Sequence, residues 1–124
     1  MREILFRGKT DKGEWVQGDL LHDGIDYDTA IVKTGSKFVT KVIPETIGQY
    51  TGLTDKNGKK IFEGDIVVLN IKGYNTICKV AWADNVAQFQ LWQTNTIPHT
   101  PTALNLGNYD CEIIGNIHDN PELL

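Results

Sequence analysis

The sequence lacks the features of a membrane or secreted protein. No apolar run approaches the about 20 residues that a membrane-spanning helix needs. The apolar start Ile4-Leu5-Phe6 ends at Arg7, which makes it too short for a signal peptide. Cys78 and Cys111 are the two cysteines among 124 residues, they form no CxxC pair, and each lies in an apolar run. We therefore expect a soluble, intracellular protein whose two thiols are buried and free, with neither a disulfide nor a metal pair.

Basic residues are absent from the last third of the chain. Residues 80–124 contain no lysine or arginine but hold five acids, and the formal net charge of the whole chain is −4. A surface that neutralises phosphates needs clustered basic residues, so this third predicts a poor nucleic-acid face. Elsewhere, the candidate nucleic-acid contacts are Lys56, Lys59, Lys60 and Lys79. The first three lie beside a predicted turn, which favours a solvated hairpin tip over a phosphate site.

Established catalytic signatures are also missing. The chain has no nucleophile elbow, P-loop, HExxH or dinucleotide fingerprint, so we predict no catalytic residue, no cofactor and no enzymatic activity. One cluster leaves an alternative open, because His22, Asp23, Asp26 and Asp28 could ligate a divalent ion. Acids beside glycine are more often turn formers, and no matched partner cluster occurs elsewhere. No metal site is therefore predicted, and a metal-dependent enzyme remains a second alternative.

Short segments of period-two hydrophobicity fill the chain. Strands are expected near residues 4–6, 15–16, 30–32, 38–43, 66–71, 76–83, 86–92 and 111–117, with turns between them. Short helical turns could fit at 44–46 and 101–106, since proline is tolerated at a first helical position. This pattern predicts an all-β protein, built as a compact barrel or a pair of curled sheets. We expect an N-terminal β-hairpin subdomain at 1–49 and a barrel core at 50–124.

Two similar segments, GKTDKGEWVQGDLL at 8–21 and GLTDKNGKKIFEGDIV at 52–67, raise the question of a duplicated site. Aspartate before a glycine-bearing turn caps backbone amides, and glycine supplies a positive φ, so backbone bending explains both copies without a ligand. Asn57-Gly58 favours a two-residue type I′ hairpin turn. The predicted turn residues are Asp11, Gly18, Asp19, Asp55, Asn57, Gly58, Gly64 and Asp65.

Five aromatic residues lie in the predicted strands: Tyr50, Trp15, Trp82, Phe89 and Trp92. They could form a stacking platform for nucleic-acid bases. Their place on alternating strands favours core packing instead, and we expect Trp92 to be the most exposed of them.

The run Tyr50–Val67, YTGLTDKNGKKIFEGDIV, resembles the signature of the YopX family of phage and prophage proteins. The start Arg2–Gly8 and the end Ile113–Leu124 are similar to the two ends of that family, so the resemblance spans nearly the whole chain. The segments 22–28 and 93–108 match no family motif. The resemblance implies a β-rich fold with an SH3-like barrel in the C-terminal half, and a phage or prophage origin in a bacterial cytoplasm. It implies no activity and no catalytic residues.

Three functions from different classes follow. The first is a non-enzymatic module that binds a phage or host protein, because the chain has no reactive constellation. The second is a nucleic-acid-binding accessory protein that uses the four lysines, and the third is the metal-dependent enzyme of His22 to Asp28. Self-association as a homo-oligomer stays open, and the identity of the partner cannot be predicted.

Overall fold

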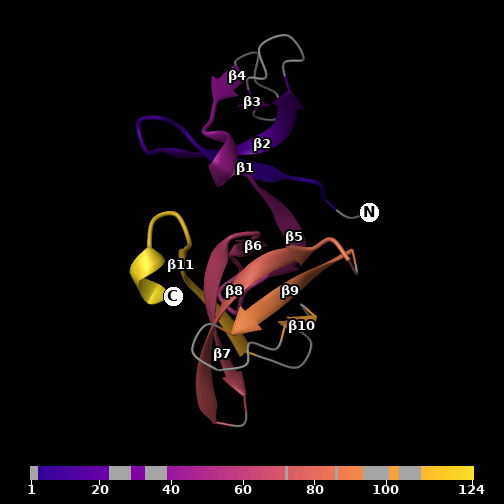
Figure 1. The fold of residues 1–124 in the computed structure, drawn as a ribbon, viewed down its shortest axis with the longest axis vertical. Helices are drawn as coiled ribbons and strands as arrows, with labels where there is room; N and C mark the ends of the chain where they lie inside the picture. Colours follow the sequence, from indigo (N-terminus) through magenta and orange to yellow (C-terminus); the bar gives the residue numbers. More distant parts are fainter. Residues whose placement is uncertain are drawn as a thin grey trace. The chain divides into compact units, whose positions relative to one another are not determined.

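The computed structural model describes residues 3–22, 29–32, 39–71, 73–85, 87–93, 101–103 and 110–124. Within these ranges the chain is all-β, as the sequence predicts, and its paired strands are antiparallel (Figure 1). It divides into two compact units, Met1–Tyr50 and Thr51–Leu124, against a predicted boundary between 49 and 50. No helix in the described ranges has the length and apolar character to cross a membrane.

Unit 1 is an antiparallel meander of four strands. They are β1 (Phe6–Lys9), β2 (Trp15–His22), β3 (Thr29–Val32) and β4 (Val39–Lys41), in the order β4-β3-β2-β1. The 3₁₀ helix η1 (Pro44–Thr46) follows, and the first residues of β5 (Gly48–Thr54) pair with β1 on its other side. The strands expected on either side of residues 12–13 pair with each other, and so do those on either side of residues 34–36. The second turn itself lies outside the described residues.

The register separates a buried face of unit 1 from an open one. Phe6, Gly8, Val16, Gly18, Leu20 and Ile31 share the inner face. Gly8 is required there because a Cβ at this position would lie 2.9 Å from Cβ of Val42. The opposite side, which we call the outer face, includes Arg7, Lys9, Trp15, Gln17, Asp19, Leu21, Ala30, Val39 and Lys41.

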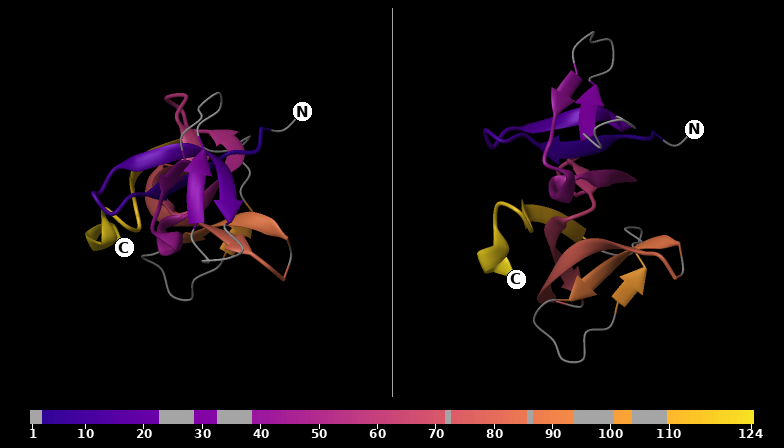
Figure 2. Two further views of the ribbon diagram at one scale, coloured as in Figure 1. Left: turned by 90° about the horizontal axis from the view of Figure 1, so that it is seen from above. Right: turned by 45° about the horizontal axis from the view of Figure 1, so that its top comes forward.

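Unit 2 contains a five-stranded antiparallel sheet in the order β10-β9-β8-β7-β11. Its strands are β7 (Asp65–Ile71), β8 (Tyr74–Ala83), β9 (Gln88–Gln93), β10 (Pro101–Ala103) and β11 (Asp110–Asn116). The last residues of β5 pair with β6 (Lys60–Phe62), and the 3₁₀ helix η2 (Pro121–Leu123) follows β11. Figure 2 shows this sheet from two further sides. No sheet is closed among the described strands, so the SH3-like barrel stays a prediction.

The prediction of a helical turn at 101–106 is wrong for its described part. Residues 101–103 form strand β10 and pair with β9 through Trp92, Leu91 and Gln90. Proline is compatible with this place because β10 is an edge strand, where a missing amide donor costs no ladder hydrogen bond.

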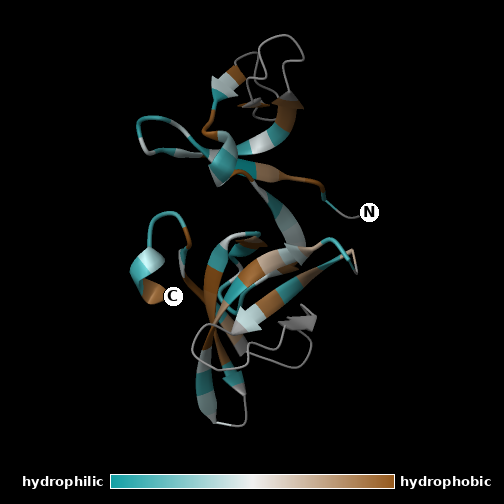
Figure 3. Cartoon of the chain, in the orientation of Figure 1, coloured by the Kyte–Doolittle hydropathy of each residue, from teal (hydrophilic) through white to brown (hydrophobic). Residues whose placement is uncertain are grey.

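The core of unit 2 lies on one face of its sheet. Alternate residues of β7, β8, β9 and β11 meet there together with one residue of β6, so strand periodicity and packing agree. Hydrophobic and hydrophilic residues follow one another along the strands of this sheet (Figure 3). The buried cluster consists of Ile61, Val67, Leu69, Cys78, Val80, Leu91 and Cys111, with Ile113 packed against it.

The most exposed tryptophan is not the predicted one. Trp92 is half-buried, whereas Trp82 exposes 42% of its surface. Trp82 follows Cys78 and Val80 on the core-facing side of β8 but lies beyond the core cluster, near the end of the strand. There it contacts Phe89 edge-to-face, with ring centroids 4.9 Å apart.

Candidate functional site

The turn at Asp55 is the centre of the sequence signature, and its backbone geometry differs from the prediction. Asp55 N donates to Lys59 O at 2.8 Å and Gly58 N donates to Asp55 O at 3.0 Å. Gly58 has a φ of 81°, while Asn57 is not among the residues of positive φ. A type I′ turn needs positive φ at both positions, so that prediction is wrong. The turn is a type I turn followed by a glycine bulge, for which aspartate in first position and glycine in fourth are favoured.

The carboxylate of Asp55 serves this turn and also a distant strand. Its Oδ1 accepts hydrogen bonds from the amides of Asn57 and Lys59, both at 2.9 Å. Its Oδ2 accepts the amide of Ile113, 58 residues away on β11, at 3.1 Å. The neighbouring Lys56 N donates to Cys111 O at 2.9 Å. The turn therefore covers the edge of β11 that faces away from β7, and protects it from pairing with another chain.

These hydrogen bonds decide the ionisation of Asp55. The side chain is buried, with 6% of its surface exposed. Burial alone would raise the pKa of Asp55. The hydrogen bonds from the amides of Ile113, Lys59 and Asn57, together with the Lys59 ammonium, lower the pKa by more than burial raises it. The net pKa lies below the ordinary value of 3.8, so Asp55 stays ionised at neutral pH as an acceptor for backbone donors.

The Gly64-Asp65 corner has the same structural role. Gly64 has a φ of 91°, its amide donates to Val80 O at 2.8 Å, and its carbonyl accepts Ile117 N at 2.9 Å. Asp65 is 1% exposed, and its Oδ2 accepts the amide of Phe62 at 2.8 Å. Asp65 thus connects the β6–β7 corner to β6, and Gly64 connects it to β8 and to the residue that follows β11, so both residues hold the bent backbone in place.

The first segment repeats the turn but not the corner. Thr10 N donates to Glu14 O, Gly13 N donates to Thr10 O, and Thr10 Oγ1 accepts Glu14 N at 3.2 Å. Thr10 therefore corresponds to Asp55, and Asp11 is an exposed residue inside the turn. The expected turn at Gly18-Asp19 is a strand, because both residues pair within the sheet through β2. The two segments share a turn type, with a threonine hydroxyl in place of the carboxylate.

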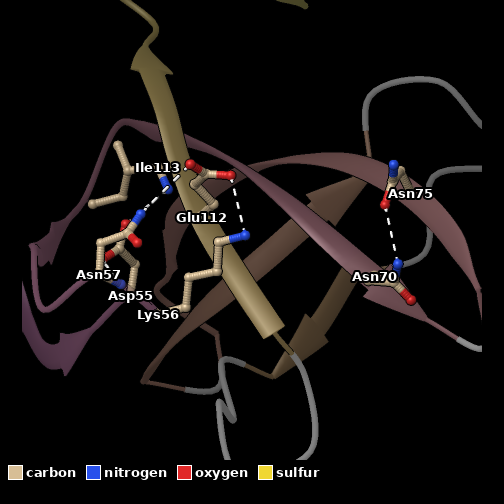
Figure 4. A network of polar contacts seen from close by, with 7 residues as sticks. All are labelled: Asp55, Lys56, Asn57, Asn70, Asn75, Glu112 and Ile113. Carbon is tan, nitrogen blue, oxygen red and sulfur yellow. Dashed lines mark hydrogen bonds and ion pairs between the residues drawn. The ribbon is translucent and has the colours of Figure 1, made fainter.

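A polar hollow of about 230 Å³ lies beside the Asp55 turn on the side of β7 and β11 opposite the core. Lys56 Nζ lies 3.4 Å from Glu112 Oε2, and Asn57 Nδ2 donates to Glu112 Oε1 at 3.5 Å (Figure 4). Across the hollow, Asn70 Nδ2 donates to Asn75 Oδ1 at 3.3 Å. These groups could hydrogen-bond a small polar molecule.

The four candidate nucleic-acid lysines have different surroundings. Lys56 faces Glu112, and both side chains are more than 40% exposed, so its charge is offset by a neighbour. Lys59 and Lys60 are exposed at the start of the β6 hairpin arm, while Lys79 is a half-buried residue of β8. A lysine whose charge is offset by a neighbouring carboxylate, as that of Lys56 is, offers less to a phosphate backbone.

Candidate reactive groups in the described part of the chain include the cysteine thiols and the possible metal ligands. Cys78 and Cys111 are free and buried, as predicted, and burial raises the pKa of both thiols to about 11. Such thiols are weak nucleophiles at neutral pH. The described residues contain no group of three or more histidine, cysteine or acidic side chains that could hold a metal ion. Of the residues in the alternative metal hypothesis, Asp23, Asp26 and Asp28 lie outside the described residues, and so does the side chain of His22.

The C-terminal signature residues fold the end of the chain. Asn116 Oδ1 accepts the amides of His118 and Asp119 at 3.0 and 2.9 Å. Asn120 Oδ1 in turn accepts Asn116 N at 3.2 Å. The asparagines thus close the loop between β11 and η2, which is a structural use of the sequence GNIHDN.

Sequence reasoning missed a cation–aromatic cluster on the outer face of unit 1. The guanidinium carbon of Arg7 lies 4.8 Å from the centroid of the Trp15 ring, and Lys9 Nζ lies 5.9 Å from it. Arg7 and Lys9 alternate on β1, and Lys9 pairs with Trp15 on β2. The sequence alone shows charged residues at alternate positions 7 and 9, which lie on one face of a strand. It does not show that Trp15 lies opposite Lys9, because that depends on the register of the hairpin.

Comparisons with known proteins identify the family of this chain and a solved structure of similar fold. The family described as "YopX protein" matches residues 5–124. The crystal structure of protein EF1440 from Enterococcus faecalis is similar, with 27% identity and a TM-score of 0.63. That match covers 100% of this chain and 99% of EF1440. No curated protein matches the chain. Since the family match spans nearly the whole sequence, the chain belongs to the YopX family.

Proposed function

We propose that this YopX-family protein is a non-enzymatic module that binds another protein, either of a phage or of its bacterial host. The proposal includes the finer expectations of the sequence, namely an SH3-like barrel in residues 50–124, a phage or prophage origin and a cytoplasmic location. These finer points rest on the family resemblance, and the free, buried cysteines are consistent with a reducing compartment.

The use of the signature side chains supports a role without catalysis. The carboxylates of Asp55 and Asp65 accept backbone amides, and the thiols of Cys78 and Cys111 lie in the core. Catalytic groups need access to a substrate together with a pKa near the working pH. All four side chains are buried, and the pKa values of Asp55, Cys78 and Cys111 also lie away from neutral pH.

The observation that carries the proposal is the outer face of unit 1. Leu21 exposes 47% of its surface and Val39 exposes 57%, on the same side of the sheet as Trp15. Aliphatic and aromatic side chains that share an exposed face are typical of a protein-binding surface. A module that only binds another protein needs such a surface and no catalytic group.

The test compares two tagged baits in lysates of infected and uninfected bacteria, the wild type and the double variant Leu21→Ser/Val39→Ser. We expect the wild type to recover specific proteins that the variant loses, since apolar anchors carry much of the binding free energy. Quantitative mass spectrometry of the eluates measures this loss. It also shows whether further copies of the chain itself are recovered, as a homo-oligomer would require.

The matched control is Tyr74→Ser, because Tyr74 is 77% exposed but lies in unit 2. It should recover the same proteins as the wild type. Urea unfolding of all baits checks that the substitutions leave the fold intact. Recovery of no specific protein, or of identical proteins by wild type and double variant, would contradict the proposal.

The nucleic-acid hypothesis remains a competing prediction with its own test. An electrophoretic mobility shift at about 50 mM salt would detect phosphate contacts, which are strongest at low ionic strength. A shift that Lys59→Ala/Lys60→Ala abolishes would favour nucleic acid over a protein partner.

A further inference from the structure

Asn57 is the asparagine of this chain best placed for spontaneous deamidation, the reaction that makes asparagine a thermolabile residue. It is the one asparagine that glycine follows, and every other asparagine precedes a larger residue. In this reaction the backbone nitrogen of the next residue attacks the side-chain amide carbon, so a glycine there leaves the approach open. Asn57 and Gly58 are both exposed, and a Cβ added to Gly58 would meet no atom within 4 Å.

The turn restrains both of the groups that react. Gly58 N, the attacking atom, donates to Asp55 O at 3.0 Å. Asn57 Nδ2, the leaving nitrogen, makes a long hydrogen bond of 3.5 Å to Glu112 Oε1 (Figure 4). Hydrogen bonds at an exposed turn contribute little free energy and open easily. The folded turn therefore slows the reaction without preventing it.

The product places a new charge against β11. Lys56 Nζ lies 3.4 Å from Glu112 Oε2, so one cation and one carboxylate stand beside the Asn57 amide. A carboxylate at position 57 repels Glu112 and competes with it for the Lys56 ammonium. If the new residue is isoaspartate, the backbone also gains one carbon atom, within the loop that Asp55 N and Lys59 O close at 2.8 Å.

We propose that Asn57 is a deamidation site and that its modification loosens the hold of the Asp55 turn on β11. The Gly58 nitrogen bonds to Asn57 Cγ, and its proton passes to the departing amino group, which leaves as ammonia. Water then opens the resulting succinimide ring at one of its two carbonyls, which gives aspartate or isoaspartate. Water is the co-reactant, and nothing is oxidised or reduced. This inference goes beyond the proposed function, whose surface lies in unit 1.

Peptide mapping of aged full-length protein tests the chemistry. The protein is kept for several weeks at mildly alkaline pH, folded or in guanidinium chloride, and mass spectrometry locates every exchange of NH₂ for OH. Methylation by an isoaspartyl methyltransferase measures the isoaspartate. We expect Asn57 to convert faster than every other asparagine, and about fivefold more slowly in the folded chain because the Gly58 hydrogen bond must open. Asn57→Gln is the control without the reactive side chain.

Hydrogen exchange followed by NMR tests the consequence for β11. The reporters are the amide of Lys56, which donates to Cys111 O, and the amide of Ile113, which donates to Asp55 Oδ2. Asn57→Asp supplies one product without ageing, and the aged protein supplies the other. Both reporters should exchange about fivefold faster in Asn57→Asp than in the wild type, and faster still in the isoaspartyl form.

The matched control is Asn75→Asp, which makes the same chemical change across the hollow. Its Oδ1 remains an acceptor for Asn70 Nδ2, so both reporters should exchange within about twofold of the wild type.

Two results would overturn the inference. One is conversion of Asn57 no faster than that of the other asparagines in the folded protein. The other is unchanged exchange of the Lys56 and Ile113 amides in both products, which would mean that the turn still holds β11. Neither result affects the capture experiment with Leu21 and Val39, so the proposed function stands or fails separately.

Discussion

Asp55 shows how one carboxylate can stabilise the turn that contains it and a strand 58 residues later. Three backbone amides donate to its two oxygens, at 2.9 to 3.1 Å. Hydrogen bonds to a charged acceptor are stronger than those to a neutral one, and leaving their donors buried and unpaired is costly. The position therefore requires an acid for the fold alone.

Replacing Asp55 with asparagine keeps the shape of the side chain but removes the charge and places an N–H₂ group against a backbone donor. We expect Asp55→Asn to lower the free energy of unfolding by about 2 kcal/mol. Urea unfolding followed by circular dichroism measures this change. Asp11→Asn is the matched control, because Asp11 lies exposed in the equivalent turn, and its effect should stay within about 0.5 kcal/mol. Equal effects of the two substitutions would contradict a special role for Asp55.

At the scale of elements, the C-terminal loop is closed by one glycine and one asparagine. A Cβ on Gly115 would lie 2.5 Å from Asn120 Oδ1, the same atom that accepts the amide of Asn116. The backbone at Gly115 has no positive φ, so alanine is excluded by this neighbour and not by its own conformation.

A double-mutant cycle tests that explanation. Gly115→Ala should cost about 2 kcal/mol of unfolding free energy in the wild type, because the asparagine must move and its hydrogen bond is lost. In an Asn120→Gly background the obstructing atoms are gone, so the same substitution should cost at least about 1 kcal/mol less. Thermal or urea unfolding of the four proteins gives the coupling energy. Additive effects would show that Asn120 is not what excludes a side chain at 115.

The strands and the turns around Gly13 and Gly58 could be predicted because their signals are local. Alternating apolar residues mark strands, and glycines beside polar residues mark turns. The turn type at Asn57-Gly58 could not be read from that pair, because the side chain of Asp55 selects a longer loop. In sequence, Gly18-Asp19 resembles the corner Gly64-Asp65 and predicts a turn. It is a strand, since Gly18 pairs with Phe6 across the hairpin.

Contacts between distant residues were beyond the sequence. No residue near Asp55 in sequence indicates that the Ile113 amide will donate to it, because this hydrogen bond depends on the position of β11 beside β7 in the sheet. In the same way, the contact of Trp15 with Arg7 follows from the β1–β2 register. The backbone-bending role of the signature could therefore be predicted, whereas the protected edge of β11 and the outer face could not.

At the scale of the whole molecule, the sequence signature and the proposed binding surface belong to different units. The signature residues of Thr51–Leu124 satisfy backbone donors and enclose a core with two inert thiols. The outer face of Met1–Tyr50 exposes the aliphatic side chains of Leu21 and Val39 to solvent. The signature by which the family is recognised thus consists of residues that hold the fold of unit 2, and the binding surface that we propose lies in unit 1.

The most direct test of this account is an NMR titration of the amide protons of Asn57, Lys59 and Ile113 from about pH 6 to about pH 2. Because hydrogen bonding holds the pKa of Asp55 below 3.8, its stabilising effect is present above that pH and is lost as the pH falls through the lower pKa of the folded protein. The account predicts that all three amides titrate together, with one midpoint below 3.8. An Ile113 amide that does not respond, or a midpoint above 3.8, would mean that Asp55 does not hold β11 and is available for another purpose.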